Sequence, residues 1–361
     1  MALFGTTSAT TAASSNTMGD LKNDFTLASP PEDGISDLKF SPQSEHLAVA
    51  SWDKKVRIYE INASGGSEGK AMFEHEGPVL GCCWSKDGRQ VVGAGADKAA
   101  RMIDLGANQT TAQQVAAHDQ PIRCVRMIDV PGQATQVLVT GSWDKTVKYW
   151  DLRQSTPVAT VPCQERVYTM DSRDSCLVIG TADRYINVIA LSKPTEFYKT
   201  MQSPLKWQTR VVSCFNDSQG FAVGSIEGRC AIQYVEEKDS SSNFSFKCHR
   251  NTGANKDISN VYSVNAISFH PVHGTFSTAG SDGTFHFWDK DAKHRLKGFQ
   301  EVGGPISATD FNRNGNIFAY AVSYDWSQGY QNNTPQGENK VRLHPVAADE
   351  SKPRAKVAGR R

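Results

Sequence analysis

The stretch Gly141–Leu152, with the sequence GSWDKTVKYWDL, is the segment from which the fold of this chain can be worked out. Ser142–Lys145 predicts a tight turn, because a short carboxylate such as that of Asp144 accepts hydrogen bonds from turn backbone N–H groups. Thr146–Trp150 follows the period-2 alternation of a half-buried β-strand. The stretch therefore predicts a strand end, a turn and a second strand.

The turn carboxylate of this unit recurs along the chain at intervals of 39 to 55 residues. This spacing and the dipeptide Trp150-Asp151 are typical of WD repeats, in which a copy of about 40–45 residues forms one four-stranded blade. One blade cannot bury both of its faces, so we expect the seven copies to pack around an axis. The predicted fold class is an all-β, seven-bladed WD-repeat β-propeller. The turn carboxylates are Asp53, Asp97, Asp144, Asp183, Glu227, Asp282 and Asp325.

Composition divides the chain into three parts. Residues 1–23 are rich in Ser, Thr and Ala without hydrophobic period, which predicts a disordered N-terminal tail. Residues 24–346 carry the repeats and form the propeller, and residues 347–361 form a flexible basic C-terminal tail. The seventh copy lacks a visible fourth strand, so residues 25–27 are predicted to supply that strand and close the ring.

Charge, hydropathy and cysteine content argue against a membrane-spanning, secreted or zinc-binding protein. The chain has 361 residues and a formal net charge of +1, so a site for an acidic partner must be a local basic patch. No apolar run reaches the length needed to span a bilayer, and the first residues lack the pattern of a secretory signal. The eight cysteines form no CxxC pair, which favours small buried hydrophobes over zinc ligation or a disulfide framework. We expect no metal and no cofactor.

One polar set has both a catalytic and a structural interpretation. His118, Ser142 or Thr140, and Asp144 have the residue types of a hydrolase triad. In a WD blade the same residues form a buried hydrogen-bond chain that ends on Trp150, since buried polar groups need partners. No P-loop, HExxH or GxSxG motif is present, so we expect a protein that is not an enzyme. His75 with Asp97 resembles the same device one copy earlier.

Two tryptophans and two arginines are the candidate residues for binding a partner peptide. Trp52 and Trp143 lie inside carboxylate turns, where no blade core needs filling. They either line one face of the ring and contact a partner or pack between adjacent turns. Arg229 and Arg250 either bind the carboxylates of an acidic peptide or are solvated surface side chains.

A second candidate site combines basic and aromatic residues around the fifth and sixth copies. Basic side chains interleaved with aromatic rings suit single-stranded nucleic acid, because phosphates and bases are bound together. Trp288 also occupies the WD position, where burial is the default, so both interpretations stand. The candidate RNA-binding residues are Phe246, Lys247, Trp288, Lys290, Lys293 and Arg295.

Stretches spread over all seven copies resemble one known family, the WD-repeat messenger-RNA export factors of the nuclear pore. A sister family of spindle-checkpoint adaptors shares SIEGR, FKCHR and the VNAISFH strand. The YDWSxG and HPVHGT stretches, with the LFG start, favour the export factors. The matching stretches are GSWDKTVKYWD (141–151), SPLKWQTR (203–210), GSIEGR (224–229), FKCHR (246–250), YSVNAISFHPVHGT (262–275), GSDGTFHFWDKDA (280–292) and NGNIFAYAVSYDWSQG (314–329).

The resemblance implies an adaptor of the nucleus, the nuclear pore complex and the nuclear envelope that acts in mRNA export. It implies binding to the GLEBS segment of an FG-repeat nucleoporin, with Arg229 and Arg250 pairing with glutamates, Trp52 packing beside the segment and Trp143 extending the surface. It also implies contact with single-stranded RNA, with mRNA export receptors and with viral inhibitors. The alternative is a checkpoint adaptor that binds GLEBS-like segments of checkpoint kinases. The groove implied for RNA and for the viral proteins comprises Phe246, Trp288, Lys290, Lys293 and Arg295.

Overall fold

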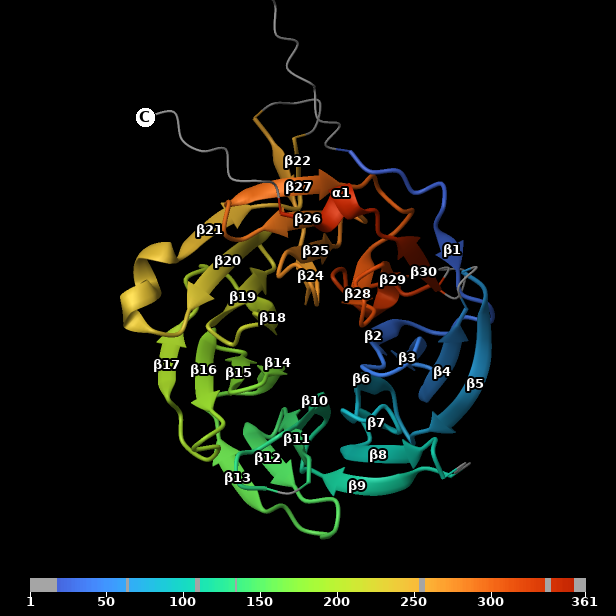
Figure 1. Ribbon diagram of the computed structural model, residues 1–361, viewed down its shortest axis with the longest axis vertical. Coiled ribbons are helices and arrows are strands. Elements are labelled where there is room, and N and C mark those ends of the chain that lie inside the picture. The colour runs from blue at the N-terminus through green and yellow to red at the C-terminus, as the bar shows by residue number, and fades with distance from the viewer. Residues whose placement is uncertain are drawn as a thin grey trace, which may run out of the picture.

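The computed structural model describes residues 18–62, 65–107, 111–133, 135–252, 257–334 and 339–353. Within these residues, seven antiparallel four-stranded sheets stand around a common axis (Figure 1). Each sheet is one blade, with an inner strand next to the axis and an outer strand at the rim. The prediction of an all-β, seven-bladed WD-repeat propeller is therefore confirmed.

The blades follow the chain order. Blade 1 comprises β2 (Ile35–Phe40), β3 (His46–Ser51), β4 (Lys55–Ile61) and β5 (Ser67–Glu74). Blade 2 comprises β6 (Val79–Trp84), β7 (Gln90–Gly95), β8 (Ala99–Asp104) and β9 (Gln113–Ala117). Blade 3 comprises β10 (Ile122–Ile128), β11 (Val137–Ser142), β12 (Thr146–Trp150) and β13 (Ala159–Pro162). Blade 4 comprises β14 (Val167–Arg173), β15 (Cys176–Thr181), β16 (Tyr185–Ala190) and β17 (Lys199–Gln202).

Blade 5 comprises β18 (Thr209–Cys214), β19 (Gly220–Ser225), β20 (Arg229–Tyr234) and β21 (Phe244–Lys247). Blade 6 comprises β24 (Val264–Phe269), β25 (Phe276–Gly280), β26 (Phe285–Asp289) and β27 (His294–Gly298). Blade 7 comprises β28 (Ile306–Phe311), β29 (Ile317–Val322), β30 (Lys340–Pro345) and β1 (Phe25–Thr26). Outside the blades lie the hairpin of β22 (Arg250–Thr252) and β23 (Ser259–Val261), two 3₁₀ turns, η1 (Glu237–Ser242) and η2 (Tyr330–Asn332), and the short helix α1 (Ala348–Ser351). None of these helices is long and apolar enough to cross a membrane, a finding limited to the described ranges.

The hydrophobic core lies between the blades. Each of the seven clusters of buried apolar side chains found in the described ranges joins two neighbouring blades. Phe285 of blade 6, for example, packs against Phe318 and Tyr320 of blade 7 with ring centroids 5.1 Å away in both cases. Because apolar burial occurs mainly across these interfaces, a single blade is not a stable unit.

Strand β1 closes the ring. It pairs antiparallel with β30, with Phe25 opposite Leu343 and Thr26 opposite Arg342. Leu27, the next residue, is 2% exposed and belongs to the cluster between blades 7 and 1. The N-terminal segment thus supplies the outer strand of the last blade, as the sequence predicts (Figure 1).

The ordered chain extends past both predicted tail boundaries. The backbone N–H of Gly19 donates to the carbonyl of Gly298 at 2.8 Å, and Leu21 packs on the cluster between blades 6 and 7. At the other end, Glu350 of α1 is buried. Composition assigns both segments to tails, whereas in the structure they cover blade edges. Residues 1–17 and 354–361 of the predicted tails lie outside the described residues.

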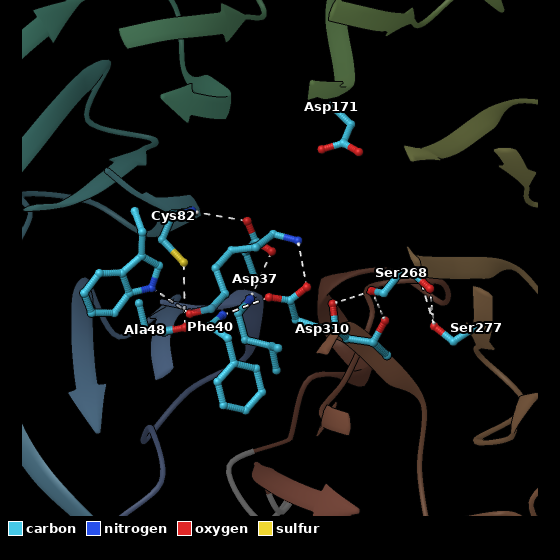
Figure 2. A network of polar contacts seen from close by, with 12 residues as sticks. Asp37, Phe40, Ala48, Cys82, Asp171, Ser268, Ser277 and Asp310 are labelled. Atoms are coloured by element: carbon cyan, nitrogen blue, oxygen red, sulfur yellow. Dashed lines mark hydrogen bonds and ion pairs between the residues drawn. The ribbon is translucent and has the colours of Figure 1, made fainter. Parts of the chain in front are cut away.

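Aspartates of the inner strands tie neighbouring blades together around the central channel, which encloses about 260 Å³. The carboxylate of Asp37 accepts from the backbone N–H of Cys82 at 3.2 Å, and that of Asp310 accepts from Phe40 at 2.8 Å (Figure 2). Asp171 likewise accepts from Cys214 of the next blade at 2.8 Å. Each bond crosses from one blade to the next, so the channel wall helps to set blade spacing.

Candidate functional site

The turn between the second and third strands of each blade is here called the corner, and in blades 1, 2, 3, 6 and 7 its carboxylate accepts a hydrogen bond from a backbone N–H of the same turn or of the strand that follows it. In blade 3, the Nδ1–H of His118 donates to Asp144 at 2.7 Å, and the hydroxyl of Thr140 donates to Nε2 of His118 at 2.7 Å. The indole N–H of Trp150 completes the chain by donating to Thr140 at 2.8 Å. Ser142 instead donates to the backbone carbonyl oxygens of Gln120 and Pro121. The structural interpretation of this polar set is confirmed.

The electrostatics of this chain agree with a structural role. Burial lowers the pKa of His118 below its usual value, so the ring is neutral and can accept from Thr140. Burial alone would raise the pKa of Asp144, but hydrogen bonds from Thr146 and His118 outweigh it and lower the pKa. A carboxylate that stays charged can keep accepting from its corner.

The same device occurs in two further blades. His75 bonds Asp97 at 3.0 Å, as the sequence predicts. His249 bonds Asp282 at 2.8 Å and Thr278 at 3.0 Å, a set that sequence reasoning missed. The separation in sequence concealed this set, because the β22–β23 hairpin lies between His249 and the corner of blade 6. His249 and Asp282 are 33 residues apart, whereas His118 and Asp144 are 26 residues apart.

All seven corners lie at one face of the ring, here called the corner face. Strand direction alternates along each blade, so the corners and the connections from one blade to the next emerge on the same side. The mouth of the channel on this face is a hollow of about 460 Å³. Corners of blades 1, 3, 5 and 7 line it with Trp52, Trp143, Ile226 and Trp326. The structure therefore brings the two tryptophans predicted for peptide binding to one site.

The tryptophans fall into two groups, according to whether the indole N–H has an acceptor inside the protein. Three of the seven tryptophans donate to acceptors inside the blades: Trp84 to the carbonyl of Lys39, Trp150 to Thr140 and Trp288 to Thr278. No such acceptor is found within the described ranges for the other four. Those four are Trp52, Trp143, Trp207 and Trp326, of which Trp143 is 36% and Trp207 60% exposed. An indole without an internal acceptor is free to bind a partner.

Arg229 and Arg250 converge on the corner of blade 5. The guanidinium of Arg250 donates to the backbone carbonyl of Glu227 at 2.7 Å, and Nε of Arg229 lies 3.9 Å from the Glu227 carboxylate. Neither arginine lines the hollow, but Ile226, which precedes Glu227, does. The structure thus brings the two arginines together beside the hollow, with part of the donor capacity of Arg250 already used.

The predicted RNA residues gather along the outer strands of blades 5 and 6. The rings of Phe246 and Trp288 lie 4.4 Å apart between centroids, and the ammonium of Lys293 lies 5.0 Å from the ring of Phe244. Lys247 lies opposite Arg229 in the pairing of β20 and β21. The candidate peptide and RNA residues are therefore cross-strand neighbours at this edge of blade 5.

The side chains of Lys290 and Trp288 are largely enclosed by the protein, whereas binding to RNA requires exposed side chains. The Lys290 side chain is 10% exposed, lies 5.0 Å from the ring of Phe215 and pairs with Asp291 at 2.8 Å. Burial opposes its charge, but the hydrogen bond that the ammonium donates to Asp291 and the negative charge of Asp291 outweigh burial and raise the pKa of Lys290. Trp288 donates to Thr278 in the His249 network. Lys247, Lys293 and Arg295 are the exposed cations among the predicted RNA-binding residues.

Metal ligation finds no support in the described ranges, which contain no group of three or more His, Cys, Asp or Glu side chains able to hold an ion. The eight cysteines are free, and six of them are buried. Their placement agrees with the interpretation that they act as small apolar side chains.

The WD domain, G-beta repeat family matches residues 23–60, 67–104, 109–151 and 245–289. The first of these begins at β1 of blade 7, so one sequence repeat spans two blades. The chain is 66% identical to "mRNA export factor GLE2" of Chaetomium thermophilum and 58% identical to "Poly(A)+ RNA export protein" of Schizosaccharomyces pombe, over 99% of each chain. It is 47% identical to "Protein Rae1" of Drosophila melanogaster, over 92% of this chain and 96% of the relative.

Proposed function

Because this chain belongs to the family of WD-repeat mRNA export factors, we propose that it is a non-enzymatic adaptor of mRNA export at the nuclear pore complex. It binds the GLEBS segment of an FG-repeat nucleoporin on its corner face and contacts single-stranded RNA along blades 5 and 6. Through these contacts it tethers RNA–protein cargo, including mRNA export receptors, at the nuclear envelope. Viral inhibitors compete for the RNA groove.

The observation that carries the peptide proposal is the meeting of Trp52 and Trp143 around one hollow beside Arg229 and Arg250. Rigid corners present these side chains before any partner arrives. A segment that is disordered when free folds onto them, with its glutamates near the arginines. Aromatic and arginine side chains are the types that dominate the energetics of protein interfaces.

The RNA proposal is supported by the exposed cations Lys247, Lys293 and Arg295 beside the aromatic pair of Phe246 and Trp288. Phosphates bind to the cations, and bases stack on the exposed part of the rings. Such contacts discriminate little between bases, so sequence preference is slight.

The peptide proposal is tested by the double substitution Arg229→Glu and Arg250→Glu. Calorimetry with a synthetic GLEBS peptide should detect no binding to this variant, because carboxylates replace the cations that meet the peptide's glutamates. The matched control is Lys86→Glu with Lys193→Glu, which makes the same change in net charge in turns of the opposite face. The control should bind like the unmodified chain. Equal affinity of both variants would refute the arginine site.

The checkpoint alternative predicts a different ranking of partners. A competition assay between the nucleoporin segment and a GLEBS-like segment of a checkpoint kinase separates the two functions. Preferential displacement of the nucleoporin peptide by the kinase peptide would favour the alternative.

A further inference from the structure

The corners share one backbone position that identifies an unusual tryptophan. The residue after the corner carboxylate has a positive φ in all seven blades, between 62° and 71°. This left-handed region suits glycine, and bulky side chains avoid it. Lysine, arginine or glycine occupies the position in six blades, and tryptophan occupies it in the seventh. The residues are Lys54, Lys98, Lys145, Arg184, Gly228, Gly283 and Trp326.

Trp326 is held in this conformation at the edge of the hollow. Its ring packs against that of Trp52 at an interplanar angle of 34°, with centroids 4.2 Å apart, and the ring of Tyr324 lies 5.7 Å from it. The pair bridges the corners of blades 7 and 1. A strained conformation that persists at a binding face points to a role for the side chain there, since glycine would serve the turn better.

The hollow combines apolar walls with positive charge from three arginines, each of which already donates at least one hydrogen bond within the protein. Trp143 and Ile226 line it from blades 3 and 5, and the charged residues that line it are Arg123, Arg166, Arg210 and Asp325. The Asp325 carboxylate already accepts from Asn265 at 2.8 Å, from the hydroxyl of Ser281 and from the backbone N–H of Ser327 at 3.1 Å. An entering group therefore meets three guanidinium groups and a carboxylate that is already hydrogen-bonded.

Polar groups in the wall also lack partners. The indole N–H groups of Trp52 and Trp326 have no hydrogen-bond acceptor within the described ranges, and both residues line the hollow. A backbone carbonyl of a bound chain would satisfy such donors.

We infer that Trp52 and Trp326 form the wall of an anchor pocket that receives one bulky apolar side chain of an acidic peptide segment. The inserted side chain packs on the two indole rings, and a neighbouring carboxylate of the segment meets the arginines of the hollow. This inference rests on the proposed function and adds to it the anchor and the residue that forms it.

The rim of the hollow favours a peptide over a nucleic acid. Carboxylates at the corner face, those of Asp53, Asp144, Glu165 and Glu227, interrupt any continuous basic track across it. A phosphate backbone would pass close to these charges, whereas a single side chain can enter the hollow between them. The basic groove of blades 5 and 6 contrasts with this mixed rim.

The substitution Trp326→Gly tests the anchor. Glycine relieves the positive φ, so the melting temperature should fall little or rise, while calorimetry with the GLEBS peptide should show affinity at least about tenfold weaker. The matched control is Lys98→Gly, which makes the same backbone change at the corner of blade 2, outside the hollow. It should bind with unchanged affinity. Trp326→Asn, a residue that tolerates positive φ, replaces the glycine variant if that variant does not fold.

A peptide series identifies the anchor on the partner. Each apolar residue of the GLEBS peptide is replaced by serine in turn. One replacement should weaken binding to the unmodified chain. The same peptide should bind the Trp326→Gly chain about as well as the original peptide does, because the peptide change and the protein change remove the same contact. Purely additive losses at every position would overturn the pocket.

The outcomes separate this inference from the proposed function. No binding of the GLEBS peptide to the unmodified chain contradicts the proposed function. Binding that is lost with the arginine variant but unchanged with Trp326→Gly and Trp326→Asn overturns the anchor pocket alone. If the Trp326 variants bind a single-stranded RNA oligonucleotide more weakly while their affinity for the peptide is unchanged, the pocket belongs to nucleic acid and the inference is also overturned.

Discussion

At the scale of single residues, His344 joins three separate parts of the chain. Its Nδ1 lies 2.7 Å from the carboxylate of Asp24 before β1, and its Nε2 lies 3.0 Å from that of Glu350 in α1. Burial favours the neutral ring, but the hydrogen bonds and charges of the two carboxylates outweigh it and raise the pKa of His344 to about 9. Tyr320 also donates to Asp24, at 2.5 Å. A charged imidazolium thus holds both chain ends to blade 7.

The raised pKa predicts a pH-dependent contribution to stability. The contribution is complete below the unfolded pKa near 6.5 and is lost as the pH rises through about 9, because the unfolded chain has released that proton already. His344→Gln should lower the free energy of unfolding by roughly 3 kcal/mol at pH 6 and by much less at pH 9.5. Urea denaturation at several pH values measures this difference. His46→Gln is the control, and parallel pH profiles for the unmodified and His344→Gln chains would contradict the ion pair.

At the scale of elements, β1 is the shortest strand of the described part of the chain, and it pairs with β30, a strand near the other end of the sequence. It is two residues long, yet it completes blade 7 and places Leu27 in the cluster between blades 7 and 1. Without it, β30 would become an exposed edge, and Asp24 would no longer meet His344. The stability of the ring therefore depends on a segment more than 300 residues distant in sequence from its partner.

Deleting residues 1–30 should lower the melting temperature by on the order of 10 °C, because strand pairing, apolar burial and the ion pair are lost together. Deleting residues 1–17 should change it little, since residues 18–26 still contact blades 6 and 7. Differential scanning calorimetry compares the two. Equal melting temperatures would show that β1 does not stabilise the closed ring.

At the scale of the whole molecule, binding depends on local charge, since the formal net charge is only +1. The corner face presents the hollow and its tryptophans, while the exposed cations gather at the edges of blades 5 and 6. The two regions meet where Arg229 lies opposite Lys247. The proposed peptide site and the proposed RNA site are therefore adjacent on one ring.

The double substitution Lys293→Glu and Arg295→Glu should reduce affinity for a single-stranded RNA oligonucleotide by about tenfold or more and make binding less dependent on salt. Lys290 is left unchanged, because its ammonium packs on Phe215 and its loss would disturb the blade. Fluorescence anisotropy at several salt concentrations gives the slope, with the Lys86→Glu, Lys193→Glu chain as control. An unchanged slope would place RNA elsewhere.

The sequence allowed much of the fold to be predicted because each blade repeats a local pattern. Each predicted turn carboxylate lies between the second and third strands of a blade, so the repeat in the sequence located all seven blades. The closing role of residues 25–27 followed from the missing strand of the last copy. Composition places residues 18–23 and α1 in the tails. In the structure they pack on blades that are distant in sequence, and composition cannot reveal such contacts.

The site was predicted in part. Trp52 and Trp143 could be selected, because a large ring inside a polar turn departs from the repeat. Trp326 was not selected, since it follows its carboxylate instead of preceding it, and its value depends on stacking with Trp52 across the ring closure. The enclosure of Lys290 was equally invisible, because Phe215 belongs to the neighbouring blade.

The repeat, the number of blades, the corner carboxylates and the family could all be predicted from residues that lie close together in the chain. The grouping of the tryptophans around one hollow, the meeting of the two arginines at one corner and the contacts of Asp24 and Glu350 with His344 became visible in the folded ring alone. These contacts join residues separated by whole blades, and such distances in sequence are bridged only when the ring closes.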